Sequence, residues 1–213
     1  MSDQCLPQLQ ACRMRVTLLD SNGVPHPGAS SVYVTKSFTE VGASAVYTDG
    51  DEIEDKNACG EVEVNYKASD SFKRLDMTIT LLTPDPFLSQ LLSGGVVLTD
   101  GQAKGFAYPG IGVAPTQLVS IEVWAKRIKN GALDPDFPYA WWVFPQVQNL
   151  RIGDKTLNAQ TQNAVFTGQA VENANWFDGP SNDWPVASDR VAQWIPTTTL
   201  PDVSCGYVAL AAS

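Results

Sequence analysis

Short runs in which apolar and polar residues alternate recur along this chain, and they constrain its fold more than any other feature. GEVEVNYKA, residues 60–68, places Val62, Val64 and Tyr66 on one side and charged or amide residues on the other. LDMTITLL, residues 75–82, alternates in the same way. A period of two is typical of β-strands with one buried and one wet face. Further β-rich runs of strand length occupy residues 12–20, 30–39, 119–128, 149–153 and 163–171.

Residues 139–145, YAWWVFP, depart from this pattern because both faces of such a strand are apolar. Tyr139 and Trp141 would point one way, and Trp142 and Phe144 the other. A strand of this kind needs a cover on each side. We expect one face to pack into the chain's own core and the other to lie under a helix or a neighbouring molecule.

One helix is expected, over about residues 85–93, within TPDPFLSQLLSGG. Asp85 suits the N-cap, Pro86 suits the first helical position, and Gly94 and Gly95 end the helix. A helix of two to three turns is not stable alone, so it must pack against a sheet. The apolar stripe available for that contact consists of Phe87, Leu88, Leu91 and Leu92.

The expected fold is therefore mainly β: a β-sandwich or partial barrel of two packed antiparallel sheets with one short flanking helix. We predict a single domain over residues 1–213. Two stretches look irregular, namely an acidic loop at about 40–60 and a segment rich in tryptophan and proline at about 173–202. Long irregular connections inside a domain are uncommon and usually functional.

The chain has 14 basic and 23 acidic residues, which give a formal charge of −9. An acidic chain with no basic patch is not expected to bind nucleic acid through phosphate contacts. No run approaches the roughly 20 apolar residues of a membrane-spanning helix. The opening MSDQCLPQLQ lacks the features of a signal peptide, so we expect folding in a cytoplasm. Four scattered cysteines predict reduced thiols, with a Cys5–Cys12 bridge left open.

The sequence shows no recognisable catalytic or cofactor-binding arrangement, so we expect neither enzyme activity nor a cofactor. The single histidine, His26, lies between two prolines, and no nucleophile elbow, phosphate-binding loop or dinucleotide-binding motif is present. The acidic run from Asp49 to Asp55 fails the EF-hand pattern, because its sixth position is Glu54 and its twelfth is Gly60. A solvated acidic loop without a metal is the better interpretation.

Four stretches of the chain form a pattern that is found together in a known family. They are NACGEVEVNYKASDSFKRLDMTITLLTPDPFLSQLLSGG (57–95), SIEVWAKR (120–127), PYAWWVFPQV (138–147) and FTGQAVENANWFDGPSNDWP (166–185). The most specific parts are the strand–helix–Gly-Gly element and the aromatic run followed by GxAxEN and WxDGP. In these stretches the chain resembles the major tail proteins, or tail tube proteins, of long-tailed bacteriophages (siphoviruses), especially those of actinobacteria. Residues 1–56 contribute little to the resemblance.

The resemblance implies a β-sandwich subunit that forms hexameric rings, whose inner strands join into one barrel and which stack into a tail tube. Double-stranded DNA would pass through the lumen without specific binding. The implied partners are further copies of the chain, the tape measure protein, the tail terminator and baseplate or tail-tip proteins. The implied location is the virion tail, after assembly in the host bacterial cytoplasm. A long hairpin that reaches a neighbouring subunit or ring is expected at residues 40–60.

Two sets of residues become candidates under this hypothesis. A polar, acidic sheet face suits a wet channel because it does not hold phosphates, although an ordinary solvent-facing surface explains the same pattern equally well. The acidic run is expected to meet basic residues such as Arg151 or Lys155. The candidate lumen-facing residues are Glu61, Glu63, Asn65, Asp76, Thr78, Thr80 and Glu122. The candidate contacts between subunits or rings are Asp49, Asp51, Glu52, Glu54, Asp55, Tyr139, Trp141, Trp142 and Phe144.

A carbohydrate-binding β-sandwich, serving as a virion decoration or receptor-binding module, is the alternative. It rests on six tryptophans, whose rings can stack on sugars, with the loop from Trp176 to Trp184 as the candidate site. Buried or interfacial tryptophans are the more common arrangement.

Overall fold

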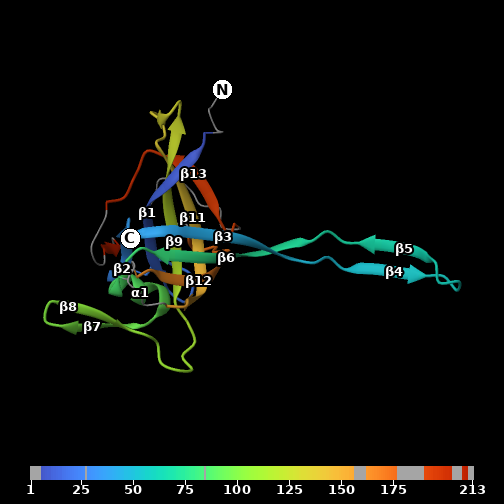
Figure 1. Ribbon diagram of the computed structural model, residues 1–213, viewed down its shortest axis with the longest axis horizontal. Coiled ribbons are helices and arrows are strands. Elements are labelled where there is room, and N and C mark those ends of the chain that lie inside the picture. Colours follow the sequence, from blue (N-terminus) through green and yellow to red (C-terminus); the bar gives the residue numbers. More distant parts are fainter. Residues whose placement is uncertain are drawn as a thin grey trace.

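The computed structural model describes residues 6–26, 28–83, 85–155, 162–176, 190–202 and 208–210. Antiparallel strands dominate this part of the chain, which contains one α-helix (Figure 1). The strands are β1 (Gln8–Leu19), β2 (Gly28–Thr35), β3 (Phe38–Thr48), β4 (Glu52–Lys56), β5 (Val62–Lys67), β6 (Ser71–Leu81), β7 (Val96–Asp100), β8 (Ala103–Ala107), β9 (Leu118–Lys129), β10 (Ala132–Leu133), β11 (Tyr139–Ile152), β12 (Ala164–Val171), β13 (Gln193–Thr197) and β14 (Val208–Leu210). The helix is α1 (Pro86–Ser93).

Ten strands form one sheet in the order β14-β2-β1-β9-β11-β12-β6-β3, with β10 attached to β9 and β13 to β11. The sheet folds over, so that β1, β9 and the start of β11 run across the direction of β3, β6 and β12 (Figure 1). Two separate ribbons, β4–β5 and β7–β8, extend from this body. The mainly β fold with packed antiparallel layers and a short helix is confirmed.

The long strand β11 joins the two halves of the folded sheet. Residues 139–143 pair with β9 and β13, whereas residues 146–152 pair with β12. The register against β9 shifts between Phe144 and Val147, around Pro145, which has no N–H to donate to a ladder. Pro145 therefore marks an irregularity in β11, but the strand does not end there. Residues 149–153, which the sequence predicts as a separate strand, largely continue β11.

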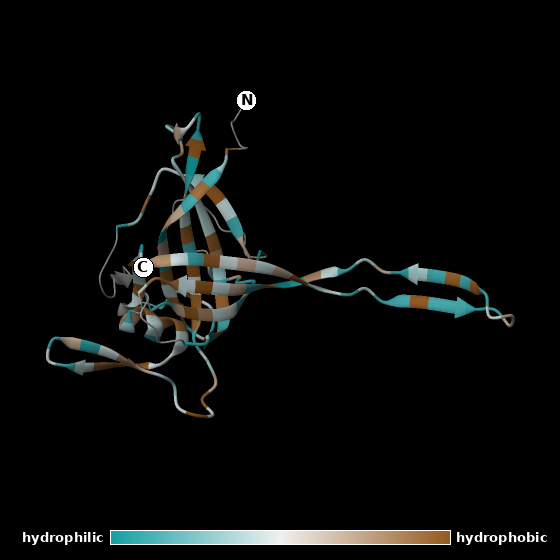
Figure 2. Ribbon diagram, viewed as in Figure 1, coloured by the Kyte–Doolittle hydropathy of each residue, from teal (hydrophilic) through white to brown (hydrophobic). Residues whose placement is uncertain are grey.

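The main core lies between the two halves of the sheet and under α1 (Figure 2). Along β6, Met77, Ile79 and Leu81 are buried and alternate with more exposed polar residues, as the period of two predicts. Strands from both halves of the sheet contribute fully buried side chains. These include Met14, Val16, Val119, Ile121, Val147 and Phe166.

Helix α1 begins and ends where its local signals predict. Asp85 accepts hydrogen bonds from the N–H groups of Phe87 and Leu88, and Pro86 occupies the first helical position. Gly94 adopts a left-handed conformation and donates to the Gln90 carbonyl. The buried side of the helix packs into the main core through Leu88, Leu91 and Leu92.

Both apolar faces of residues 139–145 are covered by the chain itself. Phe144 lies in the main core with α1, which confirms a helix as part of the cover on that side. Trp141 and Val143 lie in a second core with Trp124 and Trp176, and the rings of Trp124 and Trp141 stack with their centroids 6.1 Å apart. The second cover is thus a distant part of the same chain rather than a neighbouring molecule.

The two stretches expected to be irregular both contain strands. Residues 40–60 include most of β3 and all of β4, because this segment pairs along its length with β6 and β5. In the C-terminal stretch, β13 pairs with β11. The expected loop is therefore wrong for residues 40–60. In the C-terminal stretch the expected irregular structure is wrong only for β13, and residues 177–189 lie outside the described part.

Candidate assembly surfaces

A two-stranded arm projects from the body (Figure 1). Strands β3 and β6 leave the body side by side and continue as β4 and β5. At the joint, the Gly50 N–H donates to Asp70 Oδ1 at 3.0 Å and the Ala68 N–H donates to the Asp51 carbonyl at 2.9 Å. A Cβ on Gly50 would lie 2.0 Å from the Ala68 carbonyl oxygen. Only glycine fits this joint.

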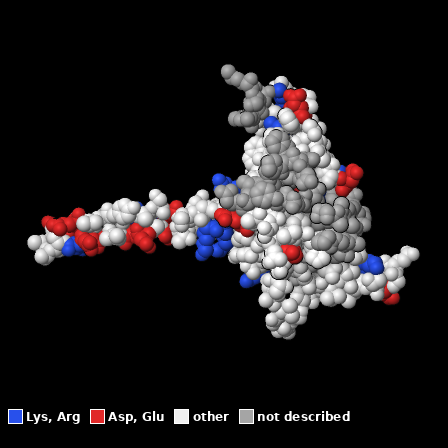
Figure 3. Space-filling model, turned by 180° about the vertical axis from the view of Figure 1, so that it is seen from behind, with Lys and Arg blue, Asp and Glu red and all other residues white. Residues whose placement is uncertain are grey.

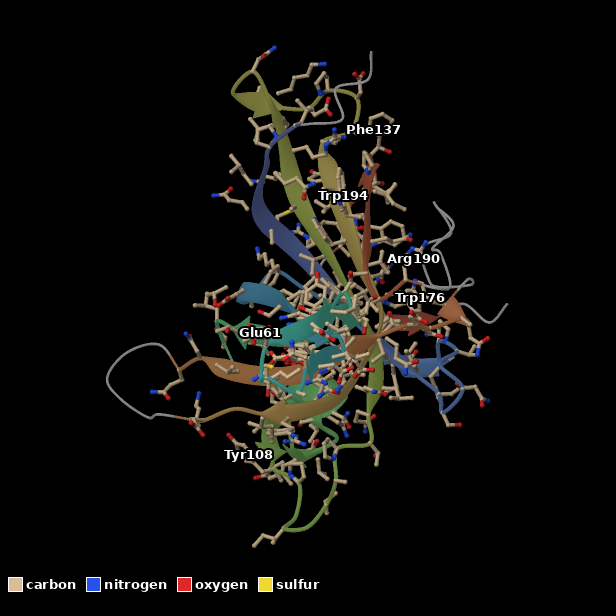
Figure 4. The ribbon with its side chains drawn as sticks, turned by 90° about the vertical axis from the view of Figure 1, so that its right-hand side faces the viewer. Glu61, Tyr108, Phe137, Trp176, Arg190 and Trp194 are labelled. Atoms are coloured by element: carbon tan, nitrogen blue, oxygen red, sulfur yellow. The ribbon has the colours of Figure 1, made fainter. Side chains whose placement is uncertain are left out.

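Asn57 fixes the turn at the tip of the arm. Its Oδ1 accepts hydrogen bonds from the N–H groups of Cys59 at 2.9 Å and Glu61 at 3.0 Å. Gly60 has a φ of 83°, in the left-handed region that glycine tolerates best. Figure 4 is viewed with the arm toward the reader and labels Glu61 beside this turn. The tip is a defined turn rather than an open loop.

The arm has one largely apolar and one polar face, as the alternation in residues 60–68 predicts, although Asp55 lies opposite Val64 on the apolar side. Its register pairs Ile53 with Tyr66 and Glu52 with Lys67. None of the described residues covers the apolar face, and its four large side chains are between 45% and 59% exposed. These side chains are Ile53, Val62, Val64 and Tyr66.

Most of the chain's negative charge lies on the arm. Residues 49–70 contain eight acidic and two basic side chains and so carry a formal charge of −6, of the −9 of the whole chain. Figure 3 shows acidic residues spread along the arm and a basic group where it joins the body. The acidic residues predicted to contact other subunits are all exposed here: Asp49, Asp51, Glu52, Glu54 and Asp55. The structure brings none of them to Arg151 or Lys155 within one chain.

A polar surface covers one side of β6 and its neighbours. Asp76 and Thr78 lie opposite Gln169 and Thr167 of β12, and together they line a shallow depression with Arg151. The Arg74 Nε lies 2.7 Å from Asp76 Oδ1, so this pair is largely neutral. The surface is polar without being strongly charged.

The seven residues predicted to face a lumen are found in three different places. Asp76, Thr78 and Thr80 lie together on the polar surface of β6. Three others lie on the arm or at its tip, and the seventh, Glu122, lies inside the body. Those on the arm are Glu61, Glu63 and Asn65.

Glu122 is fully buried, so the expectation that it lines a lumen is wrong. Its Oε1 accepts hydrogen bonds from Arg15 Nη2 at 2.6 Å and from Trp141 Nε1 at 3.0 Å. The Arg15 guanidinium also lies 5.2 Å from the centroid of the Trp124 ring. Glu122 therefore balances the charge of Arg15 inside the second core.

The aromatic residues predicted to form contacts between subunits are largely used inside the chain. Trp141 and Phe144 are buried, so this expectation is wrong for them. Trp142 is half-buried, donates from Nε1 to Gln8 Oε1 at 2.7 Å and stacks on Trp194. Tyr139 is half-buried. Trp194, on β13, is 40% exposed and is labelled in Figure 4.

Strand β3 forms an open edge of the sheet. It pairs with β6 on one side, and it ends the order of strands described here. An unpaired edge presents N–H and carbonyl groups that can pair with a strand of another molecule. The edge and the polar surface of β6 are adjacent, because Gly42 and Ser44 of β3 lie opposite Thr78 and Asp76.

Asn173 is a structural residue that sequence reasoning missed. Its buried side-chain amide donates to the Gly23 carbonyl at 2.7 Å and to the Pro145 carbonyl at 3.3 Å. It therefore ties the turn after β1 to the irregular part of β11. The signal was present, since Asn173 is the last residue of the GxAxEN pattern.

Other chemistry finds little support among the described residues. No group of three His, Cys, Asp or Glu side chains there could hold a metal ion, and no helix there is long and apolar enough to cross a membrane. Trp176 is buried and offers no open ring to a sugar (Figure 4), and Trp184 lies outside the described residues.

Cys12 and Cys59 are free thiols. Cys5 is not described, so the Cys5–Cys12 bridge is untested. Burial raises the pKa of the Cys12 thiol.

No protein-family model matches the sequence, and no curated protein matches it. Among solved structures, one similar chain comes from the sheath–tube complex of an extracellular contractile injection system (PVC) in its extended state, determined by cryo-EM. The match covers 76% of this chain and 86% of that chain, with 11% identity and a TM-score of 0.29. A TM-score this low assigns neither family nor function.

Proposed function

We propose that this chain is a structural virion protein that assembles into hexameric rings stacked as a phage tail tube. The main support for this proposal is the arm, because its apolar face is exposed along its length. An isolated two-stranded ribbon is marginally stable in water, and a contiguous exposed apolar surface marks an interaction site. A second copy of the chain would supply the missing cover.

The open edge of β3 and the polar surface of β6 support a closed tube. Pairing of β3 with a strand of the next subunit would continue the sheet around a ring and remove the exposed edge. Asp76, Thr78 and Thr80 would then face the lumen. The Arg74–Asp76 pair is largely neutral, and hydroxyl and amide side chains with the single cation Arg151 make up the rest of the polar lining of the depression. Such a surface offers few phosphate contacts, so the duplex would pass without being held tightly.

The remaining parts of the proposal follow from this assembly. The tape measure protein would occupy the lumen before DNA does, and the tail terminator and the baseplate or tail-tip proteins would bind the two ends of the tube. The protein would assemble in the host cytoplasm and end in the virion tail. Its role would be structural rather than catalytic, without a cofactor.

Sedimentation velocity of the full chain and of an arm-deleted chain tests the role of the arm. Thr48 and Ser71 are cross-strand partners, so residues 49–70 can be replaced by a two-residue Asn-Gly turn that closes a regular hairpin. We expect the full chain to form large particles as its concentration rises. The deletion variant should stay monomeric while its body keeps the same thermal midpoint.

A matched pair of double variants separates the apolar face from the arm as a whole. Ile53→Ser with Tyr66→Ser removes one cross-strand pair from the apolar face, whereas Glu52→Ser with Lys67→Ser removes the adjacent pair from the polar face without changing the net charge. The first should weaken assembly and the second should weaken it far less. Equal assembly of the arm-deleted chain and the full chain would contradict the proposal.

A further inference from the structure

A second exposed ribbon, β7–β8, projects from the end of the body opposite to the arm (Figure 1). Its register pairs Val96 with Ala107 and Leu98 with Gly105 on one face. Val96 is 58% exposed and Leu98 is 54% exposed, so this face is open and largely apolar, with Asp100 on the same face next to the turn. The opposite face carries the half-buried Val97–Phe106 pair. In the described part of the chain, the molecule thus has at each end a ribbon with one open, largely apolar face.

The two open faces have complementary shapes. The arm presents bulky side chains, whereas the β8 side of the hairpin presents Ala103, Gly105 and Ala107 beside Leu98. A Cβ on Gly105 would meet only Leu98 Cβ within 4 Å, at 3.7 Å, so the strip above β8 is open. Branched and aromatic residues of one ribbon would fill this strip, as they do between sheets packed about 10 Å apart.

Charge also permits this contact. The hairpin carries Asp100 and Lys104 and is neutral overall, so it does not repel an arm of charge −6. Lys104 donates to Thr99 Oγ1 at 3.2 Å, and Lys155, near the base of the hairpin, donates to the Asn163 carbonyl at 2.6 Å. Lys104 and Thr99 lie on the face opposite to Leu98, so Lys104 takes no part in the proposed contact. The Lys155 ammonium contacts a neutral oxygen and is available to the acidic side of an incoming arm.

We propose that the apolar face of the arm docks on the Val96–Leu98 face of the β7–β8 hairpin of a second copy. The ribbons lie at opposite ends of the body, so one chain does not bring its own two faces together (Figure 1). The contact is head-to-tail, which either closes into a ring or continues from one layer to the next. Such docking presupposes the self-assembly proposed above and names the partner of the arm.

Photo-crosslinking tests the pairing directly. A chain with p-benzoylphenylalanine in place of Tyr66 is assembled with unmodified chains labelled with 15N, irradiated, and digested for mass spectrometry. We expect crosslinks from position 66 to residues 96–107 of labelled copies. The same group in place of Lys67, on the opposite face of the arm, should give few crosslinks to that segment.

Two aspartate variants give an independent readout. Leu98→Asp places a charge on the proposed docking face and should raise the concentration needed for assembly about tenfold, equivalent to about 1.4 kcal/mol. Thr99→Asp adds the same charge on the other face and should leave assembly unchanged. Circular dichroism should show both variants folded, since both side chains lie on an exposed ribbon.

The outcomes separate this inference from the proposed function. If the chain assembles and position 66 crosslinks to another region, or Leu98→Asp and Thr99→Asp assemble alike, the docking is wrong and the tube proposal stands. If the unmodified chain never assembles, the tube proposal itself fails, and the docking fails with it.

Discussion

Glu122 and Arg15 balance each other's charge inside the second core, and their separation from water sets the cost of disturbing them. Glu122→Gln leaves the Arg15 guanidinium without its counter-charge, so we expect the free energy of unfolding to fall by about 3–5 kcal/mol. Asp76→Asn is the matched control, because it removes the carboxylate from the partly exposed Arg74–Asp76 pair and should cost about 0–1 kcal/mol. Urea unfolding measures both, and equal losses would contradict the assigned role of Glu122.

Asp76 and Glu122 also show where the sequence could predict the exposure of an acidic side chain and where it could not. Alternation along residues 75–82 correctly placed Asp76 on an open face, because the other face of that strand is uniformly apolar. Alternation along residues 119–128 gave Glu122 the same apparent exposure. Its environment depends on Arg15, 107 positions earlier, and on a cover that contains Trp176. Neither contact can be read from local pattern.

At the scale of elements, the arm depends on a joint that tolerates no side chain at Gly50. We expect Gly50→Ala to loosen β4 and β5 while the body stays intact, because the new Cβ would clash with the Ala68 carbonyl. A local loss of about 1.4 kcal/mol would speed amide exchange in residues 52–67 about tenfold, with no change in β9. Gly42→Ala is the control, since its Cβ would make contacts no closer than 3.4 Å. Unchanged exchange in the arm of Gly50→Ala would contradict this account of the joint.

Elements with a local signal were predicted, and a strand whose structure comes from pairing alone, such as β4, was not. Helix α1 has its N-cap, its proline and its terminal glycines within a few residues of one another. Strand β4 is exposed along its whole length, so burial imposed no alternation on it. Its strand structure comes from pairing with β5, which an acidic sequence between glycines does not reveal.

At the scale of the whole molecule, the order of the strands in the sheet could not be predicted from the sequence. β1 pairs with β9 and β12 with β6 across long separations, and only this order shows that β3 is an edge and that the two ribbons leave opposite ends. The polar surface of β6, the open edge and the two apolar ribbons become candidate assembly surfaces through that arrangement. The prediction of a single domain over residues 1–213 stays a prediction.

Electron microscopy of the purified full chain, over a range of protein and salt concentrations, tests self-assembly into a tube most directly. The account predicts hollow rings and stacked tubes, with the surface that carries Asp76, Thr78 and Thr80 lining the lumen once the images resolve the strands. A chain that remains monomeric under every condition would contradict it. So would an assembly in which that polar surface faces outward.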